Sequence, residues 1–440
     1  MISNQRTYSI ITYGCQMNEA DSERLGGLLQ RQGYTPASSV ETSNLILLNT
    51  CSVRDSAAQT VYGKLGEFKV MKRERDDLIL GVAGCLAESD AEYMARRAPH
   101  VDFFLGTRKM HLLPEALDRV SEHAPLIWIG DDELDEKALD QFVPRDHPFK
   151  AWVPIMRGCS YYCTFCIVPF VRGKQVSRDS KSILQEISGL VERGYKEVIL
   201  LGQTVDAYGR DRKNDLSFAG LLEAVDHVPG IERIRYTSPH PKDMTPETIE
   251  VIADSQHICH HFHLPAQSGS NRILEKMKRG YTRERYLELV AQIRVKIPGA
   301  SFSSDFIVGF PGETEEEFLE TISLVREVQF DSAFVFLYSV RQGTAAAKMP
   351  DQVAQEIKQE RFLRLNKAVG ECALARNQAV VGTDTEVLVE GPSSRNPDRL
   401  TGRTRTNRLV NFDGNPSLVG NLVQVKVESA RSWSLEGALA

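Results

Sequence analysis

The sequence lacks the long apolar runs that a membrane-spanning helix requires. No stretch of its 440 residues approaches the roughly 18–20 consecutive apolar residues of such a helix. Residues 1–6 also lack the basic-then-apolar layout of a signal peptide. We therefore expect a cytosolic protein with no membrane partner.

The composition also lacks an excess of basic residues. Lys and Arg number 53 against 59 Asp and Glu, so the net charge is −6. Such a chain has no overall attraction for a polyanion, and any contact with nucleic acid needs a local basic patch. One candidate patch lies near the carboxyl terminus and consists of Arg395, Arg399, Arg403, Arg405 and Arg408. We interpret it as a footprint for RNA phosphate, with a solvated basic face as the alternative.

Cysteine is too scarce for a disulfide scaffold, with eight in the chain, and a reducing cytosol disfavours disulfides. Cys159, Cys163 and Cys166 form a Cys-x3-Cys-x2-Cys triplet directly after a predicted strand at 152–156. Three thiolates this close can hold three irons of a cubane cluster and leave the fourth iron open to a small molecule. The alternatives are three unrelated buried cysteines and a zinc site without its fourth ligand.

A second group of cysteines is dispersed in sequence but shares a position relative to predicted strands. Cys15, Cys51 and Cys85 each follow one of the strands predicted near 8–13, 45–48 and 78–83. The carboxyl ends of parallel strands lie at one edge of a sheet, so the three thiols can converge there. We interpret them as ligands of a second iron–sulfur cluster. The alternatives are small hydrophobic residues, or a zinc site, although no His lies near these strand ends.

The chain length predicts two or three domains. The first 120 or so residues alternate short strands with helices, which is typical of a parallel α/β domain. Residues 131–150 are acidic and bear prolines, as a linker does. From residue 152 onward we count six β/α units, too few for an eight-unit barrel, and we therefore expect a partial, open (β/α)6 barrel. After a helix at 352–376, three β-rich runs predict a small antiparallel β-barrel.

Motifs spread along nearly the whole sequence resemble those of one family. They occupy residues 14–18, 49–54, 158–169, 172–173, 177–178, 200–203, 263–270, 304–314 and 401–407. Within them, an aromatic residue, Phe165, precedes the third cysteine of the triplet. On these motifs the chain resembles the methylthiotransferases, a family of radical S-adenosylmethionine enzymes. The resemblance implies three domains: a methylthiotransferase domain at 6–122, a radical S-adenosylmethionine core at 145–375 and a TRAM RNA-binding domain at 378–440.

The resemblance also implies the reaction and its cofactors. Two 4Fe-4S clusters would be held, one by Cys15, Cys51 and Cys85 and one by Cys159, Cys163 and Cys166. One S-adenosylmethionine would donate a methyl group to a sulfur on the first cluster, and a second would yield a radical at the other. The expected product is 2-methylthio-N6-dimethylallyladenosine at position 37 of tRNA, next to the anticodon.

The partners implied by the same resemblance are the tRNA anticodon stem-loop that carries prenylated adenosine and an electron donor such as flavodoxin or ferredoxin. A monomer is expected. By resemblance, contacts with S-adenosylmethionine are assigned to Phe165, Gly202, Gln203, Ser268 and Asp305. A purely structural role is the alternative for each of the last four, for instance a strand-end turn at Gly202.

Other cysteines and histidines are less informative. His257, His260, His261 and His263 lie around Cys259 and suggest zinc, but we expect them to line the barrel instead. Cys259 and Cys372 fall outside both groups and are expected to pack as small hydrophobic residues.

Two other functions remain open at this point. A member of the same family can act on threonylcarbamoyladenosine in tRNA or on an aspartate of a ribosomal protein. The chain can also be a non-catalytic iron–sulfur RNA-binding regulator, which the intact triplet with Phe165 disfavours.

Overall fold

The computed structural model describes residues 6–52, 55–120, 125–130 and 143–440. Contacts divide the chain into two compact units. The first comprises Met1–His147, Arg157–Tyr161 and Cys166–Val176, and the second Pro148–Met156, Tyr162–Phe165 and Ser177–Ala440. Residues 131–142 of the predicted linker lie outside the described part.

The first unit is built on a parallel six-stranded sheet with the order β2-β1-β3-β4-β5-β6. Its strands are β1 (Thr7–Tyr13), β2 (Thr35–Pro36), β3 (Leu45–Thr50), β4 (Ile79–Gly84), β5 (Phe103–Leu105) and β6 (Leu126–Trp128). This is the predicted parallel α/β fold, with β2 and β6 as strands that the sequence pattern did not reveal.

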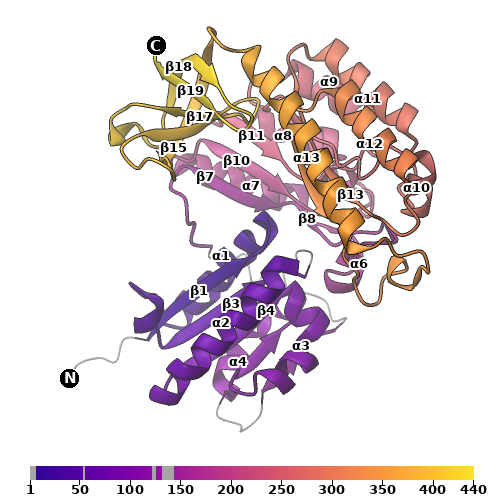
Figure 1. Cartoon of the computed structure of the whole chain (residues 1–440). Helices are drawn as coiled ribbons and strands as arrows, with labels where there is room; N and C mark the ends of the chain where they lie inside the picture. Colours follow the sequence, from indigo (N-terminus) through magenta and orange to yellow (C-terminus); the bar gives the residue numbers. More distant parts are fainter. Residues whose placement is uncertain (1–5, 53–54, 121–124, 131–142) are drawn as a thin grey trace. The chain divides into compact units, whose positions relative to one another are not determined.

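Helices cover both faces of this sheet (Figure 1). They are α1 (Gln16–Arg31), α2 (Asp55–Glu74), α3 (Cys85–Arg97) and α4 (Leu113–Arg119), with the short α6 (Val168–Val171) in a later segment of the unit. Apolar side chains of α1 and α4 pack with Leu45 and Leu47 of β3, whereas those of α2 and α3 pack with Ile46 and Leu48. The alternation of β3 therefore serves two cores, one on each face, as expected of a strand buried on both sides.

The second unit contains the six β/α strands that the sequence predicts. They form two parallel three-stranded sheets, β11-β10-β7 and β12-β13-β14. Their bounds are β7 (Lys150–Pro154), β10 (Glu197–Leu201), β11 (Arg233–Tyr236), β12 (His261–His263), β13 (Ser301–Val308) and β14 (Ser332–Leu337). A single parallel bridge between Ile234 and Ile258 joins the two sheets, so the strands follow one another in chain order as in a partial barrel. Two short strands, β8 (Met156–Arg157) and β9 (Val176–Ser177), flank the cysteine loop.

Helices of the second unit pack on one face of these strands. They are α7 (Ser180–Glu192), α8 (Phe218–Asp226), α9 (Pro246–Asp254), α10 (Asn271–Lys276), α11 (Arg283–Lys296), α12 (Glu315–Val328) and α13 (Gln355–Gln378). Five of them begin after a side chain that accepts a backbone N–H of the first turn, namely Asp179, Ser217, Thr245, Thr282 and Thr314. Figure 1 shows α9, α11, α12 and α13 side by side. Their apolar faces bury Phe262, Phe302 and Phe306 of the strands.

The chain ends in a small closed barrel with the order β15-β16-β17-β19-β18 (yellow in Figure 1). Its strands are β15 (Asp384–Pro392), β16 (Leu400–Thr404), β17 (Leu409–Phe412), β18 (Leu422–Ala430) and β19 (Leu435–Leu439). The predicted small antiparallel barrel is confirmed in four of its five strand pairs, whereas β17 and β19 run parallel. The barrel has a core of its own but belongs to the second unit, so the three domain bounds stay a prediction. Within the described residues, no helix is long and apolar enough to cross a membrane.

Candidate functional site

The register of the first sheet places Cys15, Cys51 and Cys85 at one edge. Tyr13 of β1 is the register partner of Thr50 of β3, and Thr50 is the partner of Gly84 of β4. Cys51 and Cys85 directly follow Thr50 and Gly84, and Cys15 comes two residues after Tyr13. Because β1, β3 and β4 are neighbours in the sheet, the three thiols emerge side by side at its carboxyl edge.

Two asparagines form a polar frame under these cysteines. The Asn18 side-chain amide donates to Oδ1 of Asn49 (3.2 Å), and the Asn49 amide donates to the backbone oxygen of Asn18 (2.7 Å). Oδ1 of Asn18 accepts the backbone N–H of Cys15 at 3.3 Å. A Cβ at Gly84 would lie 2.5 Å from Oδ1 of Asn49, and the φ of this residue is +99°. The asparagines and this glycine therefore fix where Cys15 and Cys85 leave the sheet.

A buried arginine contacts the third cysteine. Nε of Arg172 donates to Sγ of Cys85 at 3.2 Å, and its Nη2 donates to Asp21 at 2.8 Å. Burial raises the pKa of the Cys85 thiol to about 12, the Arg172 charge opposes that rise, and the nearby Cys51 and Cys15 thiols add to it. The Arg172 guanidinium and the three thiols therefore lie close enough to influence one another electrostatically. Arg172 belongs to a motif seen in the sequence, but its partner Cys85 is 87 residues away and sequence reasoning missed the contact.

The second cysteine group starts in a tightly turned loop. The backbone N–H of Cys159 donates to the oxygen of Gly173 (3.1 Å), and the N–H of Tyr161 donates to Sγ of Cys159 (3.4 Å). A Cβ at Gly158 would lie 2.1 Å from the backbone oxygen of Lys174, and its φ is +71°. Only glycine fits this approach of the loop to the following segment.

Cys163 lies in the second unit, where another buried arginine contacts it. Nη1 of Arg279 donates to Sγ of Cys163 at 3.5 Å, Nε to the Tyr281 hydroxyl at 3.1 Å, and Nη2 to the Pro265 oxygen at 2.9 Å. Each cysteine group therefore has one sulfur that accepts a hydrogen bond from a permanently charged guanidinium. Sequence reasoning missed Arg279 because nothing near it in the sequence suggests a site.

Phe165 is anchored beside Cys163. The backbone N–H of the intervening Thr164 donates to the oxygen of Met277 (3.1 Å), and Thr164 in turn accepts the N–H of Ala346 (2.8 Å). The Phe165 ring packs on a small core that comprises Ile273, Met277, Phe310, Tyr338 and Ala346. Its position is thus set by packing, and a contact with S-adenosylmethionine stays a prediction.

The described cysteines form neither a disulfide nor a single-metal site. No disulfide joins any of the eight cysteines, all of which the structure describes. Among the described residues, no three Cys, His, Asp or Glu side chains form a group that could hold one metal ion. A four-iron cluster distributes its ligands over different irons, so its cysteines need not meet at one point. Hydrogen bonds to the sulfurs of Cys85 and Cys163 are the kind of contact that tunes such a cluster.

The four remaining residues assigned by resemblance to S-adenosylmethionine have different surroundings. A Cβ at Gly202 would lie 2.6 Å from Met156, so this glycine is required by packing after β10. Ser268 is buried, and its hydroxyl accepts the Ser270 N–H at 3.2 Å, which holds the turn before α10. Asp305 is partly exposed on β13, and its Oδ2 lies 3.4 Å from Nε2 of His263. Gln203 is half-buried just after β10. Their role in binding the cofactor stays a prediction.

Polar side chains line the face of β12 and β13 that is turned away from the helices. Oγ of Ser303 bonds Nε2 of His261 and Nδ1 of His263, each at 2.9 Å. Burial holds the pKa of His261 well below its ordinary value, and Arg235 adds to this. His261 and His263 therefore belong to a polar row with Asp305, as expected for residues that line the barrel. Cys259 and Cys372 are buried, as expected of packing residues.

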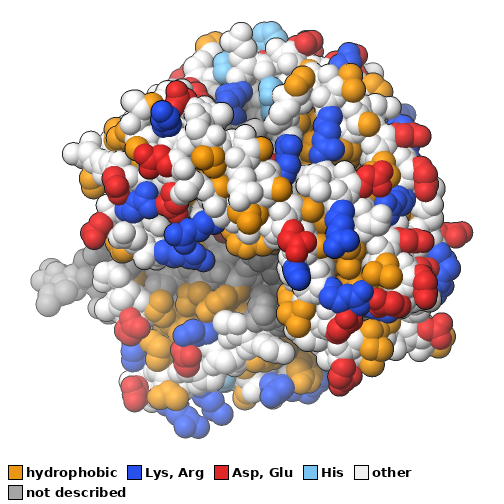
Figure 2. Space-filling view, turned by 45° about the horizontal axis from the view of Figure 1, so that its top comes forward, with side chains coloured by type: hydrophobic (Ala, Val, Ile, Leu, Met, Phe, Trp, Pro, Cys, Tyr) orange, Lys and Arg blue, Asp and Glu red, His pale blue; other side chains and the backbone are white. Residues whose placement is uncertain are grey.

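The arginines near the carboxyl terminus differ from the prediction. Arg399 pairs with Asp413 (3.0 Å), Arg403 donates to the Asn407 oxygen (3.1 Å), Arg405 to the Ile258 oxygen (3.3 Å) and Arg408 to the Asn377 side chain (3.1 Å). Ile258 and Asn377 lie outside the barrel, so part of this segment fastens the barrel to the rest of its unit. The prediction of an RNA footprint therefore overestimated how freely these side chains extend into solvent: of the five, Arg395 is exposed and the other four are partly buried. On the face in Figure 2, Lys and Arg are mixed with Asp and Glu.

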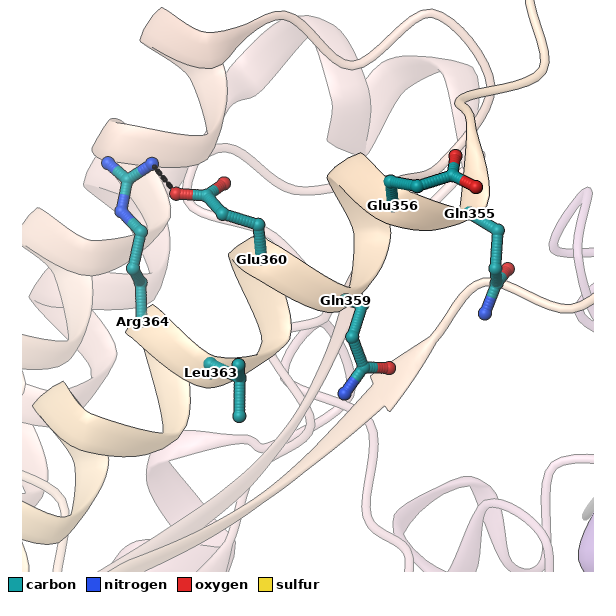
Figure 3. A pocket seen from close by; sticks show the side chains of 6 residues that line it. All are labelled: Gln355, Glu356, Gln359, Glu360, Leu363 and Arg364. Atoms are coloured by element: carbon teal, nitrogen blue, oxygen red, sulfur yellow. Dashed lines mark hydrogen bonds and ion pairs between the residues drawn. The ribbon is translucent and has the colours of Figure 1, made fainter.

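A surface hollow along α13 is unrelated to the cysteines. It is lined by Gln355, Glu356, Gln359, Glu360, Leu363 and Arg364. Figure 3 shows these side chains along one helix, with Glu360 paired to Arg364 at 2.8 Å. They are long, mostly polar and of mixed charge, which is typical of a solvated helix face. None of the predicted site residues lines it.

Models of three families match the chain. The Radical SAM superfamily matches residues 153–325, the Uncharacterized protein family UPF0004 matches 7–106, and the TRAM domain matches 378–440. The first match contains Cys159, Cys163 and Cys166, and the second contains Cys15, Cys51 and Cys85. The two cysteine groups thus lie in two separately recognised families.

Curated relatives cover the whole chain. A protein of Moorella thermoacetica named tRNA-2-methylthio-N(6)-dimethylallyladenosine synthase is 48% identical over 444 residues, covering 100% of this chain and 99% of that protein. A Carboxydothermus hydrogenoformans protein of the same name is 48% identical over 440 residues, covering 99% of each.

Solved structures of distant sequence share the fold. The radical S-adenosylmethionine methyltransferase TsrM from Kitasatospora setae has a TM-score of 0.59 and 14% identity, covering 78% of this chain and 75% of that one. The cobalamin-dependent S-adenosylmethionine radical enzyme OxsB has a TM-score of 0.51 and 12% identity, covering 84% and 56%. At these identities the likeness concerns the fold alone.

Proposed function

The chain belongs to the family of tRNA-2-methylthio-N(6)-dimethylallyladenosine synthases, and on that premise we infer that it methylthiolates C2 of N6-dimethylallyladenosine at position 37 of tRNA. It is a radical S-adenosylmethionine tRNA methylthiotransferase, and its cofactors are two 4Fe-4S clusters and S-adenosylmethionine. The inference rests on 48% identity with a curated synthase over the whole chain, together with family matches whose ranges contain both cysteine groups.

We assign the ligands as the sequence predicts. Cys159, Cys163 and Cys166 hold the cluster at which S-adenosylmethionine binds, and Cys15, Cys51 and Cys85 hold the auxiliary cluster. When bound, the clusters supply one-electron cleavage of S-adenosylmethionine and the sulfur that is transferred. The register of β1, β3 and β4 supports the second set, and the spacing of the triplet supports the first.

The residues around the cysteines are proposed to hold and orient the segments that bind the clusters. The C–H bond at C2 of adenine carries no acidic proton, so a general base would have nothing to remove and none is assigned. Arg172 and Arg279 keep a positive charge against Cys85 and Cys163 at all accessible pH values. The Asn18–Asn49 pair and the Thr164 backbone bonds keep the cysteine-bearing segments fixed.

The polar row on the open face of the strands is proposed to face cofactor and substrate. Asp305 and Gln203 remain our candidates for contacts with S-adenosylmethionine, because Asp305 is partly exposed there and Gln203 follows a strand end. Ser268 and Gly202 are proposed to act indirectly, by shaping the turns on which the site depends.

The proposed partners are the prenylated anticodon stem-loop of tRNA and a small electron donor such as flavodoxin or ferredoxin. A monomer acting in the cytoplasm is proposed with them. An RNA site of this kind is an unpaired loop whose bases can be splayed out for recognition.

Anaerobic reconstitution tests this function. The reduced chain, S-adenosylmethionine and an anticodon stem-loop with N6-dimethylallyladenosine should give 5′-deoxyadenosine and an RNA in which a methylthio group replaces the C2 hydrogen, measured by mass spectrometry. Cys163→Ala should abolish both products. Cys372→Ala is the matched control, because this buried cysteine belongs to neither group, and it should retain both. An RNA whose mass does not change with the wild-type chain would refute the proposed function.

A further inference from the structure

Strand β14 presents two aromatic side chains to solvent. Phe334 is 59% exposed and Phe336 is 38% exposed, whereas Val335 between them is 9% exposed and belongs to the core under the helices. The alternation of a strand accounts for the burial of Val335 but not for phenylalanine at both neighbouring positions. Exposing two adjacent aromatic rings to water is unfavourable, and such apolar patches often mark a site where a ligand binds.

The rings form one continuous surface. Their centroids are 6.5 Å apart, and their planes are inclined by 25°. We call this pair the aromatic surface. It lies on the face of the strand opposite to Val335 and therefore opposite to the helices of the unit.

The register continues the aromatic surface into the candidate site. Phe334 is the register partner of Asp305, and Phe336 is the partner of Ile307. Asp305 belongs to the polar row with His263. Ile307 packs on the same small core as Phe165, which follows the Cys163 loop. The aromatic surface therefore lies alongside both the polar row and the anchor of the cysteine loop.

We propose that Phe334 and Phe336 form the surface on which the dimethylallyl group of the target adenosine packs. This inference rests on the proposed function. The dimethylallyl group is a branched, five-carbon, wholly apolar substituent that offers no hydrogen bond, so an exposed apolar surface is the only recognition available to it. The amino, carboxylate and sugar groups of S-adenosylmethionine instead suit the polar row beside it.

The expected preference can be sized from the buried carbons. Packing the group on one side removes about half of its surface from water. Each fully buried carbon contributes about 0.8 kcal/mol, so five half-buried carbons contribute about 2 kcal/mol. The wild-type chain should therefore bind prenylated RNA about thirtyfold more tightly than the same RNA with plain adenosine. Removing one ring should reduce this ratio severalfold without changing the affinity for the plain RNA.

The experiment compares two RNAs with each reconstituted full-length variant. One is an anticodon stem-loop with N6-dimethylallyladenosine and the other is the same stem-loop with adenosine, and fluorescence anisotropy under anaerobic conditions gives both dissociation constants. The variants are Phe334→Ala, Phe336→Ala and Phe336→Leu. Leu319→Ala is the control, because Leu319 on α12 is 45% exposed in the same unit but lies on a helix rather than on β14.

The expected result is a ratio that falls in both alanine variants, stays near the wild-type value in Phe336→Leu and is unchanged in the control. Alanine variants that keep the wild-type ratio would overturn the inference, as would a loss of affinity that is equal for both RNAs. A wild-type chain that methylthiolates the prenylated RNA but shows no preference would also overturn it. A wild-type chain that neither prefers nor methylthiolates that RNA would instead refute the proposed function. Circular dichroism of each variant verifies folding, and Phe336→Leu keeps the test decisive if an alanine variant unfolds.

Discussion

Replacing Arg172 with Gln should destabilise the first unit severely, even in the metal-free protein. The Arg172 and Asp21 side chains are each only 7% exposed, and their charged atoms lie 2.8 Å apart. The substitution leaves the Asp21 carboxylate buried without a cation and removes the donor to Cys85. Breaking a buried ion pair in this way costs about 3–5 kcal/mol. This is a large part of the stability of an ordinary domain, about 5–15 kcal/mol.

The assay needs a probe that reports on the first unit alone. The chain has three Trp, of which Trp128 lies in β6 and Trp152 and Trp433 lie in the second unit. In a background with Trp152→Phe and Trp433→Phe, urea unfolding of the reduced, metal-free chain followed by Trp128 fluorescence gives the free energy of unfolding of this unit. Lys64→Gln is the control, because its pair with Glu67 in the same unit is 37% and 61% exposed. Such an exposed pair contributes about 0–1 kcal/mol.

A double-mutant cycle decides the physical cause. If Arg172 acts by compensating Asp21, then Asp21→Asn combined with Arg172→Gln should cost clearly less than the sum of the single substitutions. An Arg172→Gln variant that loses no more stability than Lys64→Gln would show that the buried pair with Asp21 does not stabilise the first unit. Additive single costs would show that the two charges act independently.

Three further predictions follow from the cysteine sites. Cys85→Ala should reduce the iron content after reconstitution from about eight to about four per chain, because one four-iron cluster is lost. Cys259→Ala should leave the iron content unchanged. Iron analysis measures both variants, and a full complement of iron in Cys85→Ala would contradict the auxiliary site. Gly84→Ala should lower both the stability and the iron content, because the φ of Gly84 is +99° and an added Cβ would lie 2.5 Å from the Thr50 oxygen. Gly63→Ala in α2 is the control: beyond its chain neighbours and its own helix backbone, no described heavy atom lies within 4 Å of the added Cβ, so it should be neutral or stabilising by about 0.5–1 kcal/mol. Arg279→Gln should shift the reduction potential of the cluster held by Cys163 to a more negative value. A redox titration followed by electron paramagnetic resonance measures this potential in a Cys15→Ala, Cys51→Ala, Cys85→Ala background, which lacks the other cluster. An unchanged potential would show that the contact at 3.5 Å has no electrostatic role.

Much of the site could be predicted because it depends on strand ends. Cys15, Cys51 and Cys85 could be placed together from the alternation of strands and helices alone, since carboxyl ends of parallel strands share an edge. The triplet needed only its spacing. Both inferences use local pattern and one rule of topology, and the structure of the first sheet bears out the shared edge.

The contacts that support the cysteines could not be predicted in the same way. Arg172 reaches Cys85 across 87 positions, and Arg279 reaches Cys163 across 116, so no window of sequence contains both partners. The arginines of the terminal barrel were misinterpreted from the sequence for the same reason, because their partners are distant in the chain. Arg405 and Arg408 resemble a basic patch in sequence, but their partners Ile258 and Asn377 come from other parts of the fold. Charge composition alone does not distinguish a ligand-binding arginine from one that fastens two elements together.

The function proposed for this chain is defined by the nucleoside that it modifies. Liquid chromatography with mass spectrometry of nucleosides from tRNA of a strain that lacks this gene identifies that nucleoside. In that strain N6-dimethylallyladenosine should accumulate and 2-methylthio-N6-dimethylallyladenosine should be absent. The wild-type gene should restore the methylthiolated nucleoside, whereas a Cys163→Ala gene should not. A level of the methylthiolated nucleoside that is unchanged by the deletion would show that this chain does not make it.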